Sequence, residues 1–210
     1  MTIAQPTSVP IRHVFFDIGG VLGSNGWDRE QRATAVQEFN LKELDFEYRH
    51  LETVSAWEEG RMSLDEYLDI TVFYEPRPFT KQRFTEFMFA QSQPFLDSID
   101  VVKAIRAQRR VVLMTLNNES AELNAHRIER FGLRPLFDAF LTSCWLNSRK
   151  PASIIYQRAV GVAQADPRAS VFVDDREQNL GPARQLGMRT ILFHDAAQLS
   201  DGLRSIGVLA

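Results

Sequence analysis

The sequence predicts an α/β fold, a doubly wound parallel sheet of five strands with a small all-helical domain inserted after the first strand. Five short runs are nearly continuous in apolar residues, which is typical of parallel strands buried on both faces. Amphipathic segments separate the last four runs, so the chain alternates strand and helix as doubly wound sheets do. The stretch between the first two runs contains no convincing strand and breaks this alternation.

Two of the predicted strands lead into acidic residues at their carboxyl ends. The first ends in an aspartate with two glycines close behind, and the fourth leads directly into a pair of aspartates. The five strands are predicted at His13–Asp17, Arg110–Thr115, Ala139–Ser143, Ser170–Val173 and Arg189–Phe193.

Helices are predicted where apolar residues recur at helical spacing between a capping residue and a stop. The helix that begins after Ser120 ends before Gly132, and a later one ends before Gly187. The predicted helices of the core are Ser98–Gln108, Ser120–Phe131, Ser153–Val162 and Asn179–Leu186.

Residues 24–93, the helical insert, are expected to form a separate domain, with residues 1–23 and 94–210 making up the core. The insert holds three amphipathic stretches, Arg29–Phe39, Ser63–Val72 and Thr80–Ala90, and many aromatic residues. Most of these aromatics are expected to form the insert's own apolar core. A domain inserted at this point lies above the carboxyl edge of the sheet and can act as a lid.

Composition narrows the class of protein. A net charge of −3 argues against a nucleic-acid partner. No run approaches the length of a membrane helix, and residues 1–10 lack the apolar stretch of a signal peptide. Cys144 is the only cysteine, which fits a reducing cytoplasm. The chain is expected to be a cytoplasmic monomer or homodimer.

Three carboxylates are expected to meet at one edge of the sheet. Asp17 ends the first strand, and Asp174 and Asp175 follow the fourth. The carboxyl edge of an open parallel sheet is where such proteins bind ligands. Acidic groups gathered there would repel one another unless a cation joins them, and oxygen ligands of this kind suit Mg²⁺. Each aspartate alone could equally cap a turn or a helix.

Other polar residues follow the remaining strands. Thr115 ends the second strand, with Asn118 shortly after it, and Lys150 follows the third. A hydroxyl and a lysine placed there could bind phosphate oxygens. Taken singly, Thr115 could be a strand-end residue beside a turn, and Lys150 a surface lysine.

Taken together, the order Asp17, Thr115, Lys150, Asp174-Asp175 resembles the four motifs of the haloacid dehalogenase-like (HAD) hydrolase superfamily. The resemblance runs from Val14 to Phe193. It implies a Rossmann-like core, with the insert in the place of a C1-type cap.

The resemblance also implies a phosphatase mechanism. Asp17 would attack phosphorus and form an aspartyl-phosphate that water hydrolyses. Mg²⁺ would be held by Asp17, the carbonyl of Gly19 and Asp175, with Asp174 assisting. Thr115 and Lys150, with Asn118 standing in for a motif residue, would bind the phosphoryl oxygens. Three carboxylates, one ammonium and one divalent cation balance to zero charge, so a phosphate dianion could enter only when the metal is bound.

The sequence departs from the resemblance at two places. The first motif is usually D-x-D, but Gly19 stands where the second aspartate would act as general acid and base, a loss typically worth about 10²–10⁴-fold. Asp28, Glu58 or Glu59 of the insert could replace it. In the second motif Leu116 follows the threonine where asparagine is usual.

Three functions are compatible with these residues. The favoured one is a Mg²⁺-dependent phosphatase for a small phosphorylated metabolite. The alternative is a catalytically impaired binding or regulatory protein with the same fold, which Gly19 and Leu116 favour. A 2-haloacid dehalogenase is weaker, because the paired aspartates without a metal would repel a carboxylate substrate.

Overall fold

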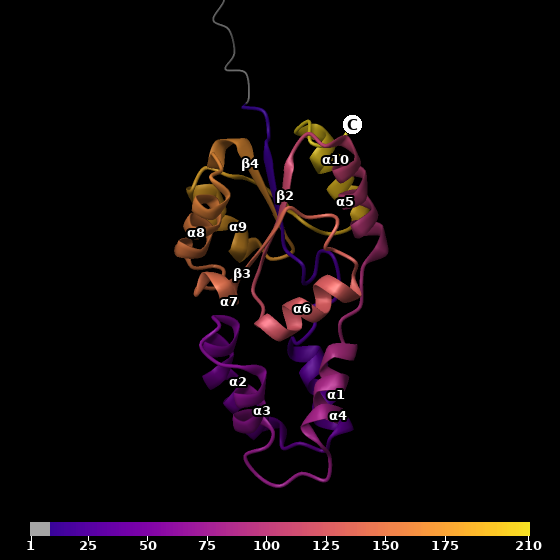
Figure 1. Ribbon diagram of the computed structural model, residues 1–210, viewed down its shortest axis with the longest axis vertical. Helices are drawn as coiled ribbons and strands as arrows, with labels where there is room; N and C mark the ends of the chain where they lie inside the picture. Colours follow the sequence, from indigo (N-terminus) through magenta and orange to yellow (C-terminus); the bar gives the residue numbers. More distant parts are fainter. Residues whose placement is uncertain (1–8) are drawn as a thin grey trace, which may run out of the picture.

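The computed structural model describes residues 9–210 (Figure 1). The expectation about a signal peptide falls on residues 1–8 and their neighbours, so most of it lies outside the described part of the chain. Within that part, no helix combines the length and the apolar character needed to span a bilayer.

Five parallel strands form one sheet in the order β3-β2-β1-β4-β5, which confirms the predicted α/β fold. The first strand, β1, lies in the centre, flanked by β2 and β4. The strand order therefore reverses at β1 and β4, and the crevice beyond their carboxyl ends is the usual ligand position of such sheets. The strands are β1 (His13–Phe16), β2 (Val112–Asn117), β3 (Ala139–Thr142), β4 (Ser170–Asp174) and β5 (Arg189–Leu192).

Two layers of helices cover the sheet, as a doubly wound fold requires (Figure 1). On one face, α5 (Leu96–Gln108) and α10 (Ala196–Ser205) bury Val102 and Leu203 against the strands. On the other face, α8 (Ser153–Ala163) and α9 (Glu177–Gln185) bury Ile155 and Leu180. The remaining core elements are α6 (Ala121–Arg130), the one-turn helix α7 (Ser143–Leu146) and the 3₁₀ turn η1 (Pro167–Ala169).

The strand β2 differs from its prediction. The sequence pattern predicts an end at Thr115, but the strand continues to Asn117 because Leu116 pairs with Leu141 and Asn117 with Thr142. Asparagine is uncommon in strands and favours turns, so the pattern indicates an end two residues early. Asn117 is accommodated because Asn124 and Thr142 both lie within hydrogen-bond distance of its buried side chain.

Four helices lie in the insert, and they pack around a cluster of their own. Trp27, Trp57, Tyr67 and Phe84 are buried in this cluster, and Leu123 of α6 is the core residue that joins it. The aromatic residues thus mainly pack against one another, as predicted. The helices are α1 (Arg29–Glu38), α2 (Glu43–Glu58), α3 (Leu64–Thr71) and α4 (Lys81–Ala90).

Three of these four helices are predicted by the sequence. Ser63 accepts a hydrogen bond from the backbone N–H of Glu66 at the start of α3, and Thr80 accepts one from Arg83 at the start of α4. The longest, α2, is not predicted. Its buried face includes His50 and Thr53, so its apolar stripe is interrupted.

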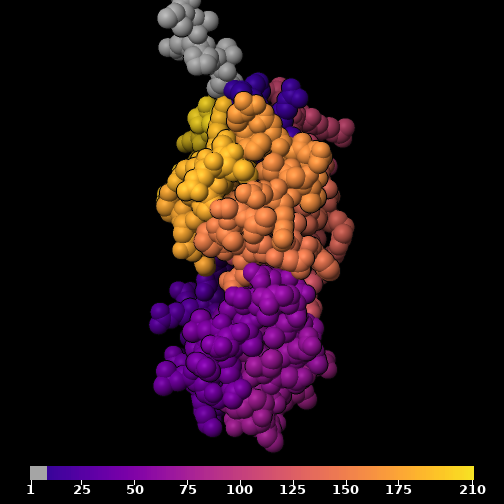
Figure 2. Space-filling view, turned by 90° about the vertical axis from the view of Figure 1, so that its left-hand side faces the viewer, coloured from indigo at the N-terminus to yellow at the C-terminus, as the bar shows by residue number. Residues whose placement is uncertain are grey.

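The helical insert and the core adjoin as two lobes (Figure 2). At one contact the backbones come unusually close. Gly60, which follows α2, has φ +72°, and a Cβ built on it would lie 2.2 Å from the carbonyl oxygen of Cys144. Glycine is required here both for its left-handed backbone and for this approach. Nearby, the Leu64 N–H donates to Glu122 of α6 at 2.9 Å.

We therefore expect Gly60→Ala to destabilise the protein more than Gly132→Ala. Gly132 follows α6 with a similar φ of +63°, but a Cβ added to it would meet no atom within 4 Å. The left-handed backbone alone should cost about 1–2 kcal/mol in each variant. The clash should cost Gly60→Ala about 1–3 kcal/mol more, measured as the free energy of unfolding in urea. Equal losses in the two variants would show that the contact with Cys144 relaxes freely.

Candidate active site

The predicted acidic residues meet at the carboxyl ends of β1 and β4. Asp17 directly follows β1, and its N–H donates to the Val173 carbonyl of β4 at 2.9 Å. Asp174 is the last residue of β4. Oxygens of Asp17, Asp174 and Asp175 all lie within 4.8 Å of one another, the only such group of metal-ligand residues in the described part of the chain. The two neighbouring strands therefore place the three carboxylates together, as the sequence predicted.

Lys150 holds two of these carboxylates. Its ammonium lies 2.9 Å from Asp17 Oδ1 and 2.7 Å from Asp174 Oδ2, with all three side chains buried or nearly so. Burial raises the pKa of Asp17 to about 7, with Lys150 opposing and Asp174 and Asp175 reinforcing the rise. Burial alone would lower the pKa of Lys150, but the two carboxylates outweigh it and raise that pKa. The lysine is therefore a charged, buried part of the site.

Asn118 fixes the backbone of Lys150. Its side chain accepts from the Lys150 N–H at 2.8 Å and donates to the Lys150 carbonyl at 2.9 Å. Asn118 lies at the cavity, as predicted, but its amide is committed to this clamp. It therefore places the lysine, in contrast to the predicted direct role on phosphate.

Thr115 is not brought to the cavity. Because β2 extends to Asn117, Thr115 pairs with Phe16 inside the sheet and is fully buried. Its hydroxyl has no hydrogen-bond partner in the described structure. The expectation that Thr115 ends a strand and faces the site rests on the early end predicted for β2, and the structure corrects it.

Asp174 is held from several sides. Asn179, in the first turn of α9, donates to both its oxygens at 2.9 and 3.1 Å, and the Arg176 N–H donates to Oδ1 at 2.9 Å. Together with Lys150, these donors compensate its burial. The geometry makes Asp174 chiefly the partner of Lys150.

Asp175 differs, because its Oδ1 is buried without a hydrogen-bond partner in the described structure. Burial and the charge of Asp174 raise its pKa. Gly20 lies against this carboxylate with φ +77°, and a Cβ there would be 2.2 Å from Asp175 Oδ2. A carboxylate oxygen without a hydrogen-bond partner, next to a turn made of glycines, could bind a cation together with Asp17 and the carbonyl of Gly19.

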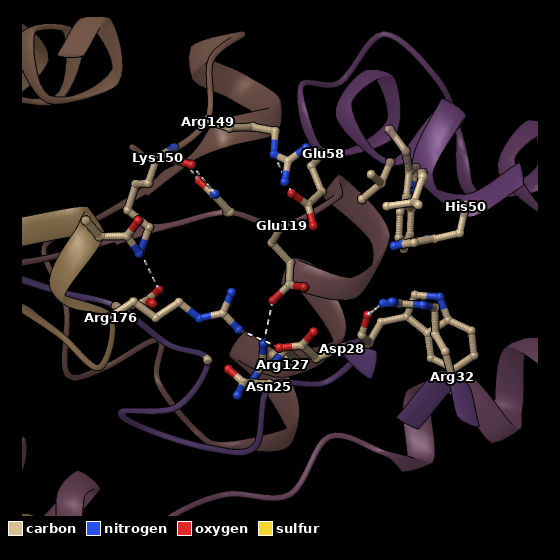
Figure 3. Close-up of a pocket in the computed structure, with 18 residues that line it drawn as sticks. Asn25, Asp28, Arg32, His50, Glu58, Glu119, Arg127, Arg149, Lys150 and Arg176 are labelled. Carbon is tan, nitrogen blue, oxygen red and sulfur yellow. Dashed lines mark hydrogen bonds and ion pairs between the residues drawn. The ribbon is translucent and has the colours of Figure 1, made fainter. Parts of the chain in front are cut away.

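Above this cluster is a cavity of about 260 Å³ that core and insert line together (Figure 3). The walls are mostly polar and rich in ion pairs. The charged residues that line it are Asp17, Asp28, Arg32, Glu58, Glu119, Arg127, Arg149, Lys150 and Arg176.

Several of these residues are not predicted by the sequence motifs. Arg127 of α6 is buried and pairs with Glu119 at 2.6 Å, and it also donates to the Ser24 carbonyl. Burial raises the pKa of Glu119, with Arg127 opposing. A sequence signal exists, since Arg127 falls on the same helical face as Leu123, where a charged residue is unusual.

Two ion pairs join the insert to the core at this cavity. Glu58, the last residue of α2, lies 2.7 Å from Arg149 Nε, and Asp28 pairs with Arg176. The carbonyl of Glu58 also accepts from Ser143 Oγ at 2.6 Å. These contacts hold the carboxyl end of α2 against the core.

The three carboxylates that could substitute for the missing acid differ clearly in the structure. Asp28 caps α1, and although burial would raise its pKa, the Arg29 N–H and Arg176 lower it. Glu59 pairs with Arg61 and is not among the cavity residues. Burial raises the pKa of Glu58 to about 7, with Arg149 opposing.

His50 of α2 also lines the cavity, but it is not a charged group. Its Nδ1 lies 2.8 Å from the Tyr67 hydroxyl, which accepts from Trp27 Nε1 at 3.0 Å and is therefore free to donate to the ring. Burial and the neighbouring Arg32 lower the pKa of His50 to about 4. The imidazole is neutral near pH 7.

Comparison with known proteins gives partial relatives and includes a relative of nearly full length. Bifunctional epoxide hydrolase 2 of Sus scrofa is 43% identical over 63 residues, which are 30% of this chain and only 11% of that protein. D-ribitol-5-phosphate phosphatase of Bacteroides thetaiotaomicron is 25% identical over 194 residues, covering 86% of this chain and 90% of that one.

Solved structures share the fold. A HAD family enzyme of Bacteroides thetaiotaomicron superposes with a TM-score of 0.76 at 20% identity, covering 90% of this chain and 98% of that one. Another structure of that enzyme, with a TM-score of 0.71 at 19% identity, is a complex with magnesium and inorganic phosphate. The family model for haloacid dehalogenase-like hydrolases matches residues 11–187. The chain therefore belongs to the haloacid dehalogenase-like hydrolases, as its motifs predicted.

Proposed function

We propose that this protein is a Mg²⁺-dependent phosphatase that hydrolyses a small phosphorylated metabolite through an aspartyl-phosphate on Asp17. The observation that carries the proposal is the buried arrangement in which Lys150 joins Asp17, which lines the shared cavity with it, to Asp174 behind them. A carboxylate nucleophile needs to be fixed and exposed to substrate on one side. The ammonium of Lys150 fixes Asp17 and leaves positive charge beside an incoming phosphate.

The residues present fit a magnesium ion. Asp17, Asp175 and the carbonyl of Gly19 would hold it, while Asp174, whose oxygens already accept several hydrogen bonds, would assist mainly by holding Lys150. Bound there, Mg²⁺ would offset negative charge on the phosphoryl oxygens and align the group for displacement. The related structure that contains magnesium and inorganic phosphate supports this assignment.

The chain's own residues would perform the displacement in a simple sequence. One oxygen of Asp17 attacks phosphorus, and Lys150 compensates the charge gathering on the phosphoryl oxygens. Asn118 and Asn179 keep the lysine and its partner Asp174 in place throughout. Thr115 takes no part, because it lies within the sheet.

The cavity favours a small substrate with many hydroxyl groups. Its charged side chains are largely matched in ion pairs, such as Glu58 with Arg149 and Arg127 with Glu119, so it offers donors and acceptors in comparable number. Hydroxyl groups can satisfy both kinds. The similarity to a D-ribitol-5-phosphate phosphatase supports a sugar or polyol phosphate. The C1-type cap, the domain bounds at 23 and 94, the cytoplasmic location and the oligomeric state stay predictions.

One observation favours the alternative of a catalytically impaired binding protein. A side chain at position 19 would project toward Asn25 Oδ1 and the guanidinium of Arg127, 3.2 and 3.5 Å from its Cβ. This is the position from which an acid would face the cavity, and glycine leaves it without a side chain. The dehalogenase alternative is disfavoured by the paired aspartates, whose charge would repel a carboxylate substrate.

Phosphate release from p-nitrophenyl phosphate distinguishes these functions. We expect turnover with Mg²⁺, loss of turnover with EDTA, and a loss of at least about 10³-fold in Asp17→Asn, because the nucleophile is removed. The good leaving group needs little acid assistance, so Gly19 does not mask the result. A protein that binds Mg²⁺ yet releases no phosphate would support the impaired protein, and turnover unchanged in EDTA would contradict the metal assignment.

Gly20→Ala tests the metal site without an activity assay. The new Cβ would overlap the Asp175 carboxylate and force it to rotate away. We expect the dissociation constant for Mg²⁺, measured by titration calorimetry, to rise about 10–100-fold, the range found when supporting groups of metal ligands are disturbed. Gly207→Ala is the matched control, with φ +76° and no atom within 4 Å of its Cβ. Equal affinities in the two variants would argue against Asp175 as a ligand.

A further inference from the structure

Gly19 leaves the proposed phosphatase without the acid that protonates the leaving oxygen, so another donor has to come from the walls of the cavity. Besides Asp17, three carboxylates line it: Asp28, Glu58 and Glu119. Each is paired with an arginine, and they differ in what else holds them.

Two of the three are poor donors. Asp28 accepts the Arg29 N–H at 2.8 Å and completes a capping box at α1, and these contacts favour its ionised form. Glu119 is almost fully buried, and Arg127 lies 2.6 Å from it and is itself 2% exposed. A carboxylate fixed in this way on a buried arginine has little access to a leaving group.

Glu58 differs in position and access. It is the last residue of α2 and enters the cavity from the helical insert, facing Arg149 and Glu119 of the core (Figure 3). About 20% of its side chain is exposed. Ser143 holds the backbone of Glu58 on the core, whereas Glu58 Oε2 lies 2.7 Å from Arg149 Nε as an ion pair and has no hydrogen-bond partner in the described structure.

We propose that Glu58 is the general acid and base of the reaction, a role that rests on the proposed phosphatase function. The insert thus supplies the catalytic group that the core lacks at position 19, since Glu58 lines the same cavity as Asp17.

In the proposed reaction, Glu58 donates a proton in the first step and accepts one in the second. In the first, Asp17 forms a bond to phosphorus, the bond from phosphorus to the substrate oxygen breaks, and that oxygen takes the electron pair and the proton of Glu58. In the second, the Glu58 carboxylate takes a proton from water as its oxygen attacks phosphorus. The bond to Asp17 then breaks with its electron pair, which releases inorganic phosphate and leaves Glu58 protonated again.

The electrostatics suit a group that must give and take a proton. Burial raises the pKa of Glu58 to about 7, and the groups that face it act in both directions: Arg149 and Arg176 lower it, and Glu119 and Asp28 raise it. A pKa near the working pH is the optimum for such a group. Since a poor leaving group needs the protonated form in the first step, kcat/KM for phenyl phosphate should fall as the pH rises through about 7, and Glu58→Gln should lack this decline.

The test uses the full-length protein with Mg²⁺ and two aryl phosphates that differ in leaving group. Phenyl phosphate needs a proton donor, whereas p-nitrophenyl phosphate does not. In Glu58→Gln we expect turnover of phenyl phosphate to fall about 10²–10⁴-fold. With p-nitrophenyl phosphate we expect a burst of about one p-nitrophenol per protein followed by slow turnover, because the phosphorylated Asp17 accumulates.

Glu59→Gln is the matched control, since Glu59 is the adjacent carboxylate and pairs with Arg61 away from the cavity. Glu58→Asp, which keeps a titrating group, should restore part of the second step. A burst also reports folding, because it requires a working Asp17.

Three results would overturn the role. One is a Glu58→Gln variant that matches Glu59→Gln on both substrates. Another is an equal loss on both substrates without a burst in a variant that still binds Mg²⁺. The third is a wild-type protein that releases no phosphate from either substrate, which would overturn the proposed function together with the role of Glu58, whereas the first two leave that function standing.

Discussion

The structure depends on keeping three carboxylates and one ammonium together at the buried edge of a parallel sheet. Charges in such a place lose most of their hydration, and only close partners can compensate the loss. Lys150 lies 2.9 Å from Asp17 and 2.7 Å from Asp174, and each of these groups is then fixed by neighbours. Asn118 clamps the lysine backbone, and Asn179 supports Asp174. The loops after β2, β3 and β4 therefore have their conformations set by the same four charges.

Much of the fold could be predicted because it follows from burial. The five strands are short runs rich in apolar residues, and the order of the elements predicts a doubly wound sheet. The predictions that were wrong or missing concern residues whose position depends on tertiary partners. The strand β2 passes through Asn117 only because Asn124 and Thr142 stabilise a buried amide, and this removed Thr115 from the site. The helix α2 is not predicted, because its buried face includes the polar residue His50, whose ring lies within hydrogen-bond distance of the Tyr67 hydroxyl.

The residues of the candidate site also fall into those that could be predicted from the sequence and those that could not. Asp17, Lys150, Asp174 and Asp175 could be placed from their positions after successive strands, since the sheet brings strand ends together. The Arg127–Glu119 pair could not: the position of Arg127 on the apolar face of its helix is a signal that the residue is unusual, but it does not identify Glu119 as the partner. The three carboxylates of the insert were equivalent in sequence, and only their surroundings separate them: a helix cap for Asp28, a solvent-side arginine for Glu59 and the cavity wall for Glu58.

Glu58 lies two residues before Gly60, where the insert touches the backbone of the core. Under the proposed roles, the nucleophile Asp17 comes from the core and the proton donor Glu58 from the helical insert, so the two parts of the chain would each supply one half of the reaction. Substitutions in α2 would then alter reactivity and substrate fit together, because His50 and Trp57 of that helix line the cavity with Glu58. Exchange of inserts between relatives would then transplant acid–base chemistry along with recognition, and a relative that keeps an aspartate in the core would be free of this linkage.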